Sequence, residues 1–462
     1  MLMNNQTRKI LLLSTTYSLF MAIYTCWRHE LFLTRAYDLG IFTQAFWTTI
    51  YAGKFFYETP DLNISATGSF FGVHFSPLMF LILIIFAIAP HPYTLLIFQS
   101  VILGFAAIPL FKLSYKILKD EKISTIFVVL YLLYPPIIYA NIFDFHLESF
   151  FPLIFSYAFY YLENEEFVKF YVTLLLGLLI LDFASSILVL STVIYGSIVK
   201  YRRVIFRKKW DQKILRHLIF SAMMMAVAVF YFVLSIIALR FFGKIPFSGD
   251  SNWPDLGNTP FEIIIGLLDP SKVFRALSYD FGTKILNLAL YLLPLIFLPL
   301  FAPLELLPGM PWLVMSLLSR YPPYYQIYWQ YGAIMSPFLF YSALHGLRRI
   351  TNLRRKNVFS EIKIVQSVYF KLIRRKKNAL IVFVLLNLFT MSISVYSQAS
   401  TLPCGVPQYS QFAPTKHIEY LRKIVYYIPN DASVLAQNNI FPHLATRINA
   451  YTWINPENSS IV

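Results

Sequence analysis

The stretch "SPLMFLILIIFAIAP", residues 76–90, decides how often the chain crosses a membrane. It is apolar and short, and a proline lies near each end. A run of about 10 to 14 apolar residues is more often interfacial or re-entrant than spanning. The positions of the basic residues test whether it crosses, because loops rich in Lys and Arg stay on the cytoplasmic side of a membrane.

Longer apolar runs flank this stretch on both sides. The chain is 57% hydrophobic and 13% charged, whereas soluble domains carry about a quarter charged residues. Runs of about 15 to 25 apolar residues recur, and each is long enough to cross a hydrocarbon core about 30 Å thick. A barrel would instead show alternating segments of about ten residues. The sequence therefore predicts an all-α polytopic membrane protein.

Three basic clusters lie between the apolar runs, with four Lys/Arg in 112–122, eight in 200–217 and eleven in 348–377. If residues 76–90 do not cross, all three share the cytoplasmic side with the N-terminus. If they cross, the three clusters lie opposite it. We therefore expect about eleven spans in the cell membrane, with the N-terminus cytoplasmic and the C-terminus outside. The expected spans are 9–27, 92–112, 123–141, 149–163, 167–182, 184–200, 218–242, 284–302, 309–320, 331–347 and 378–398.

The same distribution bears on partners and domains. The net charge of +16 is explained by cytoplasmic loops, which indicates contact with anionic membrane lipids rather than nucleic acid. Residues 1–398 form the expected transmembrane domain, with a long first outer loop over 28–91. The Pro-rich stretch 294–311 is expected to hold broken helices.

Residues 399–462 form the expected outer tail. "TKHIEYLRKIVYYIP" (415–429) has apolar residues at helical spacing, and "ASVLAQ" (432–437) is typical of a strand. We therefore expect a short α/β tail, which either packs on the outer face of the membrane domain or is an incomplete domain.

The acid of "RAYDLGIFTQAFW" (35–47) follows the first span. If 36–50 is helical, Asp38 shares a face with Ile41, Phe42 and Ala45. Partial burial there would raise its pKa and suit it to a catalytic base. Alternatively, Asp38 simply caps the following helix. The residues alone leave these two interpretations even.

A second outer turn contains "FDFHLES" (143–149). Asp144, His146 and Glu148 alternate with apolar residues, so in an extended segment all three would point the same way. Such a set suits a divalent cation such as Mg or Mn, or the positioning of a hydroxyl and an acid. The alternative is a polar turn that merely separates two spans.

Three more candidates for substrate binding lie on the outer side. His74 opens the 76–90 stretch, and Asp182 ends the 167–182 span. Arg320 begins "RYPPYYQIYWQY" (320–331), and arginine suits phosphate recognition. The aromatic residues after it could stack on a sugar, or form an ordinary membrane-interface belt.

The order of four motifs resembles a family of uncharacterised polytopic membrane proteins of archaea and bacteria, grouped with the GT-C glycosyltransferases. The motifs are "YDLGIFTQAFW" (37–47), "HFSPL" (74–78), "FDFHLES" and "IPNDASVLAQNNIFPHLATR" (428–447). The resemblance covers nearly the whole chain, and the first and third motifs are the most specific. It implies a GT-C-like fold with the tail outside.

GT-C enzymes transfer sugar from a polyprenyl-phosphate carrier to an acceptor on the outer side of the membrane. By this resemblance Asp38 is the base, His74 contacts substrate, and the Asp144–His146–Glu148 turn supplies metal ligands as in some members. The first loop departs from the pattern, since many relatives show two close acids where this chain has one. Two alternatives stay open: a lipid or solute transporter, and a non-catalytic relative.

Overall fold

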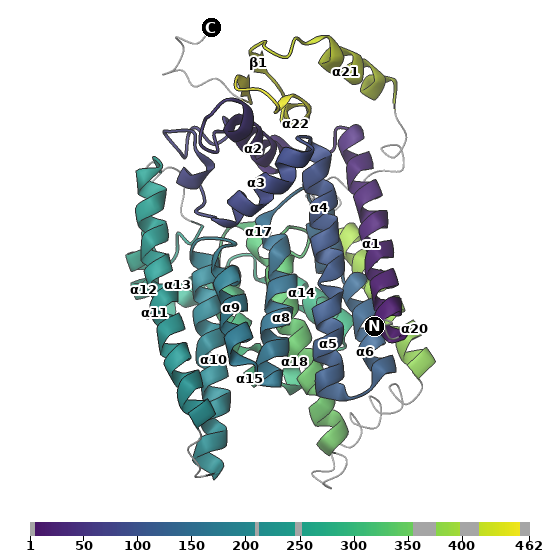
Figure 1. The fold of residues 1–462 in the computed structure, drawn as a ribbon, viewed down its shortest axis with the longest axis vertical. Coiled ribbons are helices and arrows are strands. Elements are labelled where there is room, and N and C mark those ends of the chain that lie inside the picture. The colour runs from purple at the N-terminus through teal and green to yellow at the C-terminus, as the bar shows by residue number, and fades with distance from the viewer. Residues whose placement is uncertain (1–4, 208–211, 245–251, 354–375, 398–414, 453–462) are drawn as a thin grey trace.

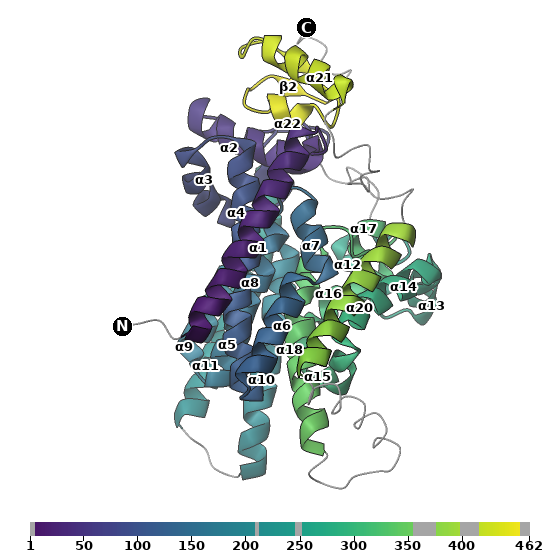
Figure 2. The same cartoon turned by 90° about the vertical axis from the view of Figure 1, so that its right-hand side faces the viewer.

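In the computed structural model, helices run side by side as one bundle, and a smaller unit from the C-terminal segment lies across one end (Figures 1 and 2). The structure describes residues 5–207, 212–244, 252–353, 376–397 and 415–452. Much of the expected 348–377 loop and the end of the tail lie outside these described residues.

The described chain is mostly helical, as the apolar runs predicted. The bundle contains α1 (Asn5–Glu30), α4 (Pro92–Phe105), α5 (Ala107–Leu118), α6 (Glu121–Leu132), α7 (Pro135–Ile142), α8 (Phe151–Asn164), α9 (Phe167–Leu178), α10 (Phe183–Arg207), α11 (Gln212–Phe241), α14 (Phe281–Leu292), α16 (Met310–Leu318), α18 (Gly332–Leu353) and α20 (Lys376–Ser397). Shorter elements are η1 (Ala36–Gly40), α2 (Ile41–Tyr51), η2 (Phe70–Gly72), α3 (Leu78–Ile88), η3 (Leu147–Phe150), α12 (Pro260–Gly266), α13 (Pro270–Ser278), η4 (Leu293–Leu295), η5 (Leu298–Phe301), α15 (Pro303–Leu306), η6 (Leu307–Gly309) and α17 (Pro322–Tyr325).

Within the described residues, four helical segments are long and apolar enough to cross a membrane: Asn5–Glu30, Pro92–Leu118, Glu121–Ile142 and Leu215–Phe241. Several shorter apolar helices accompany them. Among these, α3 occupies the 76–90 stretch with 11 residues, about 16 Å at 1.5 Å per residue. That length is well below a hydrocarbon core of about 30 Å, so α3 is a short helix as expected.

Close packing of α1 on α4 builds one wall of the bundle. A Cβ on Gly104 would collide with Ser18 Oγ and lie 3.0 Å from the Ser14 carbonyl oxygen. Small residues at such a crossing let two helix backbones approach. In a bilayer, helices associate through this close packing because the lipid is as apolar as the side chains. Both helices extend to the end of the bundle where the tail lies (Figure 2).

The expected break in the Pro-rich stretch is confirmed. Instead of continuous spans over 284–302 and 309–320, the chain forms short helical pieces, because prolines there lack the N–H that a helix needs. Ile296 and Phe297 both adopt left-handed backbone angles. Ser342 Oγ of α18 donates to the carbonyls of Pro299 and Ala302 at 3.0 and 2.8 Å, which satisfies the broken backbone.

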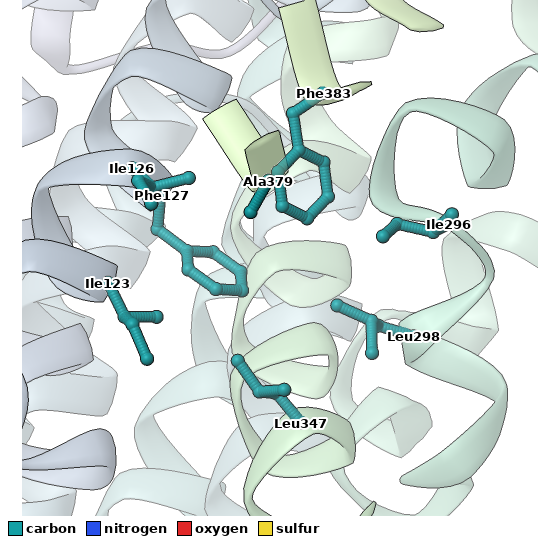
Figure 3. A pocket seen from close by; sticks show the side chains of 8 residues that line it. All are labelled: Ile123, Ile126, Phe127, Ile296, Leu298, Leu347, Ala379 and Phe383. Atoms are coloured by element: carbon teal, nitrogen blue, oxygen red, sulfur yellow. The ribbon is translucent and has the colours of Figure 1, made fainter. Parts of the chain in front are cut away.

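A small apolar pocket lies beside this break (Figure 3). Its walls come from α6, the 296–298 backbone reversal, α18 and α20. The lining residues are Ile123, Ile126, Phe127, Ile296, Leu298, Leu347, Ala379 and Phe383. The lining offers neither a polar atom nor a charge for chemistry, so the pocket is not a candidate active site.

An ion network ties α8, α15 and α18 together near the same break. Arg349 Nη2 lies 2.6 and 2.7 Å from the two carboxylate oxygens of Glu305. His345 lies 3.3 Å from Glu163, and Tyr341 donates to that carboxylate at 2.8 Å. Because Glu305 is buried, its charge depends on the guanidinium that pairs with it.

Arg349→Lys is therefore expected to cost about 1–2 kcal/mol of stability. An ammonium cannot reach both partners at once, whereas Arg349 Nη2 contacts Glu305 and Nη1 donates to the Phe301 carbonyl at 3.2 Å. The Tm in detergent, followed by intrinsic fluorescence, measures this. The matched control is Arg348→Lys at the neighbouring exposed position, which should leave Tm unchanged. Equal Tm values for the two variants would contradict the role of the network.

The tail contains the predicted helix and strand. α21 (Lys416–Tyr427) is followed by β1 (Val434–Leu435), α22 (Phe441–Leu444) and β2 (Ala450–Tyr451). The two strands pair in parallel, with Val434 opposite Ala450 and Leu435 opposite Tyr451. This unit rests on α2 and the ends of α1 and α4 (Figure 1).

Candidate functional site

Four connections between helices meet at the bundle end that carries the tail. They are η1, the first loop over 52–77, the turn over 143–150 and the link over 179–182. Each carries side chains that the sequence singled out. These side chains are Asp38, His74, Asp144, His146, Glu148 and Asp182.

The Asp38 carboxylate pairs with the His146 imidazole. Asp38 Oδ1 lies 3.0 Å from His146 Nε2, and the two side chains are 15% and 7% exposed. The Phe143 ring stacks on the imidazole at 5.1 Å between centroids, and Phe42 approaches it edge-on at 6.3 Å. These rings fix the orientation of the imidazole. A carboxylate held by an imidazole among apolar rings is suited to proton transfer.

The alternative role of Asp38 as a helix cap does not hold. Neither η1 nor α2 has a side-chain hydrogen bond at its N-cap residue. Asp144 Oδ2 instead accepts the Arg35 backbone N–H at 2.8 Å, so a second candidate acid holds the start of η1. The Asp38 carboxylate is thereby left to His146.

The charges in this pair act on each other. Burial lowers the pKa of His146, but the hydrogen bond and charge of Asp38 outweigh burial and leave that pKa above its ordinary value. Burial raises the pKa of Asp144 to about 7, and the Asp38 charge adds to the rise. The pKa of the Asp144 carboxyl thus lies nearer to neutral pH than that of an exposed aspartate.

Gln99 of α4 is a site residue that the sequence reasoning missed. Its amide is fully buried and donates to the backbone carbonyl of Asp144, with the carbonyls of Ala140 and Asn141 at 3.2 and 3.3 Å. Its Oε1 accepts the backbone N–H of His146 at 2.7 Å. One side chain thus fixes the turn that presents His146. In the sequence, Gln99 is a single amide inside an apolar run. Nothing nearby in the sequence indicates which groups it contacts.

A second pair lies between the first loop and the α9–α10 link. His74 Nδ1 is 3.3 Å from Asp182 Oδ2, with the imidazole half exposed and the carboxylate buried. Ser76 Oγ donates to the carbonyls of Leu179 and Ile180 at 3.2 and 2.7 Å, which joins the two segments. The His74 imidazole is therefore the exposed partner of a pair whose carboxylate is buried.

Glu148 and two first-loop acids complete the group. Burial raises the pKa of Glu148, and the charges of His146 and His74 oppose that rise, so Glu148 lies within electrostatic range of both pairs. Burial raises the pKa of Asp61 to about 6, His74 lowers it and Asp38 raises it. Glu58 is buried, and its Oε2 accepts the Asp61 N–H at 3.0 Å. The sequence analysis did not assign Glu58 or Asp61 to the site.

The aromatic stretch 320–331 borders the site. Trp329 meets Phe143 edge-on at 4.9 Å, and Phe143 in turn stacks on His146. Tyr324 and Tyr331 contact each other at 4.7 Å. At least part of the expected belt therefore borders the acid group rather than facing lipid alone.

Arg320 does not join this group. Its Nε and Nη2 lie 2.6 and 2.7 Å from the two carboxylate oxygens of Asp255, and its guanidinium lies 4.7 Å from the Tyr279 ring centroid. Arg275 Nε contacts the same carboxylate at 3.1 Å, so Asp255 is shared by two arginines. The contact of Arg320 with a lipid phosphate stays a prediction, at a place separate from the Asp38–His146 pair.

The expected metal ligands do not converge. Asp144 has a left-handed φ of 66°, and a 3-10 turn begins at Leu147, so the extended alternation that would align Asp144, His146 and Glu148 is interrupted on both sides of His146. Within the described ranges, no three His, Cys, Asp or Glu side chains are grouped to hold a metal ion. The residues do not fit Mg or Mn as placed, and no step proposed below uses a metal.

A protein-family model covers most of the chain. A family model described as "Predicted membrane protein (DUF2079)" matches residues 28–460, which includes every segment of the site. The chain belongs to the DUF2079 family. The match agrees with the membrane character of the helices and with the uncharacterised family that the motifs resemble. No curated protein matches this DUF2079 chain.

The raised carboxyl pKa values predict how the stability of this DUF2079 chain depends on pH. The folded values of about 6 for Asp61 and about 7 for Asp144 exceed the ordinary 3.8. At pH values between the ordinary and the raised pKa, the folded state binds more protons than the unfolded state. The free energy of unfolding therefore falls as the pH rises through this range. Asp61→Asn removes one buried charge and should raise Tm on the order of 2 °C at about pH 8, but little at about pH 4.

Thermal unfolding at the two pH values measures this difference. Asp269→Asn is the matched control, because Asp269 caps α13 and asparagine caps a helix as well as aspartate does. A lower Tm for Asp61→Asn at the higher pH would refute the argument.

Proposed function

We propose that the chain is a membrane glycosyltransferase of the GT-C type. It transfers a sugar from a polyprenyl-phosphate carrier to an acceptor on the outer side of the membrane. The observation that carries the proposal is the Asp38–His146 pair, held at one bundle end within electrostatic range of Asp61, Asp144 and Glu148. The four-motif resemblance supports the choice of reaction.

The proposed reaction needs a base but no protein nucleophile. Asp38 accepts the proton of an acceptor hydroxyl as that oxygen attacks the anomeric carbon of the sugar. The bond from this carbon to the phosphate oxygen breaks, and its electron pair leaves with the polyprenyl phosphate. The sugar is transferred with inversion. His146 holds the carboxylate toward the acceptor, and its charge stabilises the ionised form.

The outer side of the site follows from the proposed topology. About eleven spans, with the N-terminus cytoplasmic, put the basic clusters inside and the acid group outside. The tail then lies outside, in line with its position over the acid group. His74 and Asp182 are the proposed substrate contacts, because the His74 ring is exposed beside this group.

The position of the acids argues against the transporter alternative. Ion-coupling acids of transporters lie near the membrane midplane between broken helices. Here the acids lie in connections at one end of the bundle, whereas the broken stretch 293–309 borders an apolar pocket.

Proteoliposomes that contain the purified chain and a radiolabelled sugar polyprenyl phosphate test the proposal. We expect label to leave the carrier and polyprenyl phosphate to appear in equal amount, when candidate acceptors are supplied. Empty liposomes correct for spontaneous hydrolysis. If no candidate donor loses label above that control, the enzyme is not a transferase of this class, and a non-catalytic role becomes the better account.

A further inference from the structure

We infer that residues 436–452 of the tail form a clamp that positions the catalytic base, with Asn438 and Phe441 as its positioning residues. The inference rests on the proposed function of Asp38, but the clamp itself is a set of contacts that can be tested separately. These contacts lie on both sides of Asp38 along η1 and continue into α2.

The first contact lies two residues before Asp38. The Ala36 backbone N–H donates to the backbone oxygen of Asn438 at 2.8 Å and to its Oδ1 at 2.7 Å. Ala36 is fully buried in the small apolar cluster that the tail forms with it. One asparagine thus holds the first turn of η1 by both of its oxygens.

The second contact lies two residues after Asp38. A Cβ on Gly40 would lie 2.6 Å from Phe441 Cδ1, so the aromatic ring packs directly against the η1 backbone. Phe441 is fully buried. Gly40 has ordinary helical angles, φ −64° and ψ −48°, so an alanine there would strain the packing and not the backbone.

A third contact ties the tail to α2 and the first loop. The buried Gln44 Nε2 lies 3.1, 3.2 and 3.3 Å from the carbonyl oxygens of Arg447, Ile448 and Ala450. Its Oε1 accepts the Thr59 N–H at 2.9 Å. A single amide therefore joins three segments that are far apart in sequence.

The clamp is itself anchored. The His443 ring stacks on His29 at the end of α1, with 3.9 Å between centroids and 14° between planes. Arg447 donates to the carbonyls of Leu444, Pro429 and Ala432 at 2.8–3.1 Å, which holds the tail loop in one shape. The tail is thus fixed to the bundle and rigid where it meets η1.

Such support is needed because η1 is a five-residue π-turn without a side-chain cap. A single turn fixes several backbone angles for few hydrogen bonds and is unstable by itself. A reacting group must be held within about 0.5 Å of its productive position. The clamp supplies that precision to Asp38 without contacting the reacting atoms.

Asn438→Ala and Phe441→Ala test the clamp in the full-length chain. Hydrogen exchange at the Ala36–Gln44 backbone should become at least about tenfold faster, because local opening no longer breaks these contacts. Sugar transfer should show a kcat lower by about 100-fold, the effect of a misplacement near 1 Å, with KM for the donor nearly unchanged. The matched control is Tyr426→Ala, an exposed residue of α21 in the same tail, which should change neither.

A double-mutant cycle between Gly40 and Phe441 distinguishes loss of the clamp contact from general misfolding. Gly40→Ala forces the ring away and should also speed exchange, whereas adding Phe441→Ala to it removes the collision and should worsen exchange no further. Unchanged exchange in Asn438→Ala and Phe441→Ala overturns the clamp. Fast exchange with normal kcat overturns the positioning role. If the wild type transfers no sugar, the proposed function fails while the exchange arm still decides the clamp.

Discussion

Asp38→Asn should lower sugar transfer by about 10²–10⁴-fold, the usual contribution of a general base. Asparagine keeps the shape of the side chain and one oxygen that can face His146 Nε2, now 3.0 Å from Asp38 Oδ1. An amide cannot accept the acceptor proton, so the loss should fall on kcat and leave donor KM close to the wild-type value. Transfer in proteoliposomes at saturating donor measures it.

The matched control for that variant is Asp120→Asn. Asp120 caps α6 by accepting the Ile123 N–H at 3.0 Å, and asparagine serves as well in that position. Both variants should reach the membrane in equal amounts. Near-normal transfer by Asp38→Asn would remove the base assignment, whatever the state of the rest of the site.

Gln99→Leu should reduce both stability and activity, because one buried amide serves four backbone groups. Leucine leaves the His146 N–H and the Asp144 carbonyl buried without that partner, at a cost of about 3 kcal/mol in total. The turn then relaxes and His146 moves relative to Asp38. We expect a lower Tm and a kcat lower by about 100-fold, by the same positional argument as for the clamp.

Two comparisons make this result specific. Gln99→Glu keeps an acceptor for the His146 backbone N–H but turns a carboxyl oxygen toward three carbonyl oxygens. Its Tm and kcat should therefore be no higher than those of Gln99→Leu. Gln212→Leu makes the same exchange at an exposed position at the start of α11 and should be neutral. A stable Gln99→Leu protein with full activity would show that the turn holds His146 without this amide.

The sequence determined the helical membrane class and most members of the acid group. Apolar runs specify helices because a backbone in lipid must satisfy its own hydrogen bonds. The positions of the basic loops predicted that one side of the membrane holds Asp38, His74, Asp144, His146, Glu148 and Asp182. The structure brings these residues to one end of the bundle, since all follow or precede helix ends.

Only the tertiary structure decided which partner each of these residues contacts. Asp38 was equally a base or a cap by sequence, and its pairing with His146, 108 positions away, removed the cap interpretation. Asp144, His146 and Glu148 are not aligned as in an extended strand, because a left-handed residue and a 3-10 turn redirect their side chains. Arg320 pairs with Asp255, a contact between distant segments that no local sequence pattern predicts.

The supporting residues were beyond the sequence for the same reason. Gln99 lies in an apolar helix, and the partners of Gln44 in the tail lie about 400 residues further along the chain. Periodicity and propensity act over a few residues, so they fix where helices form and which faces are apolar. Hydrogen bonds between distant segments depend on how the helices and loops pack, and it is those bonds that hold the acid group in place.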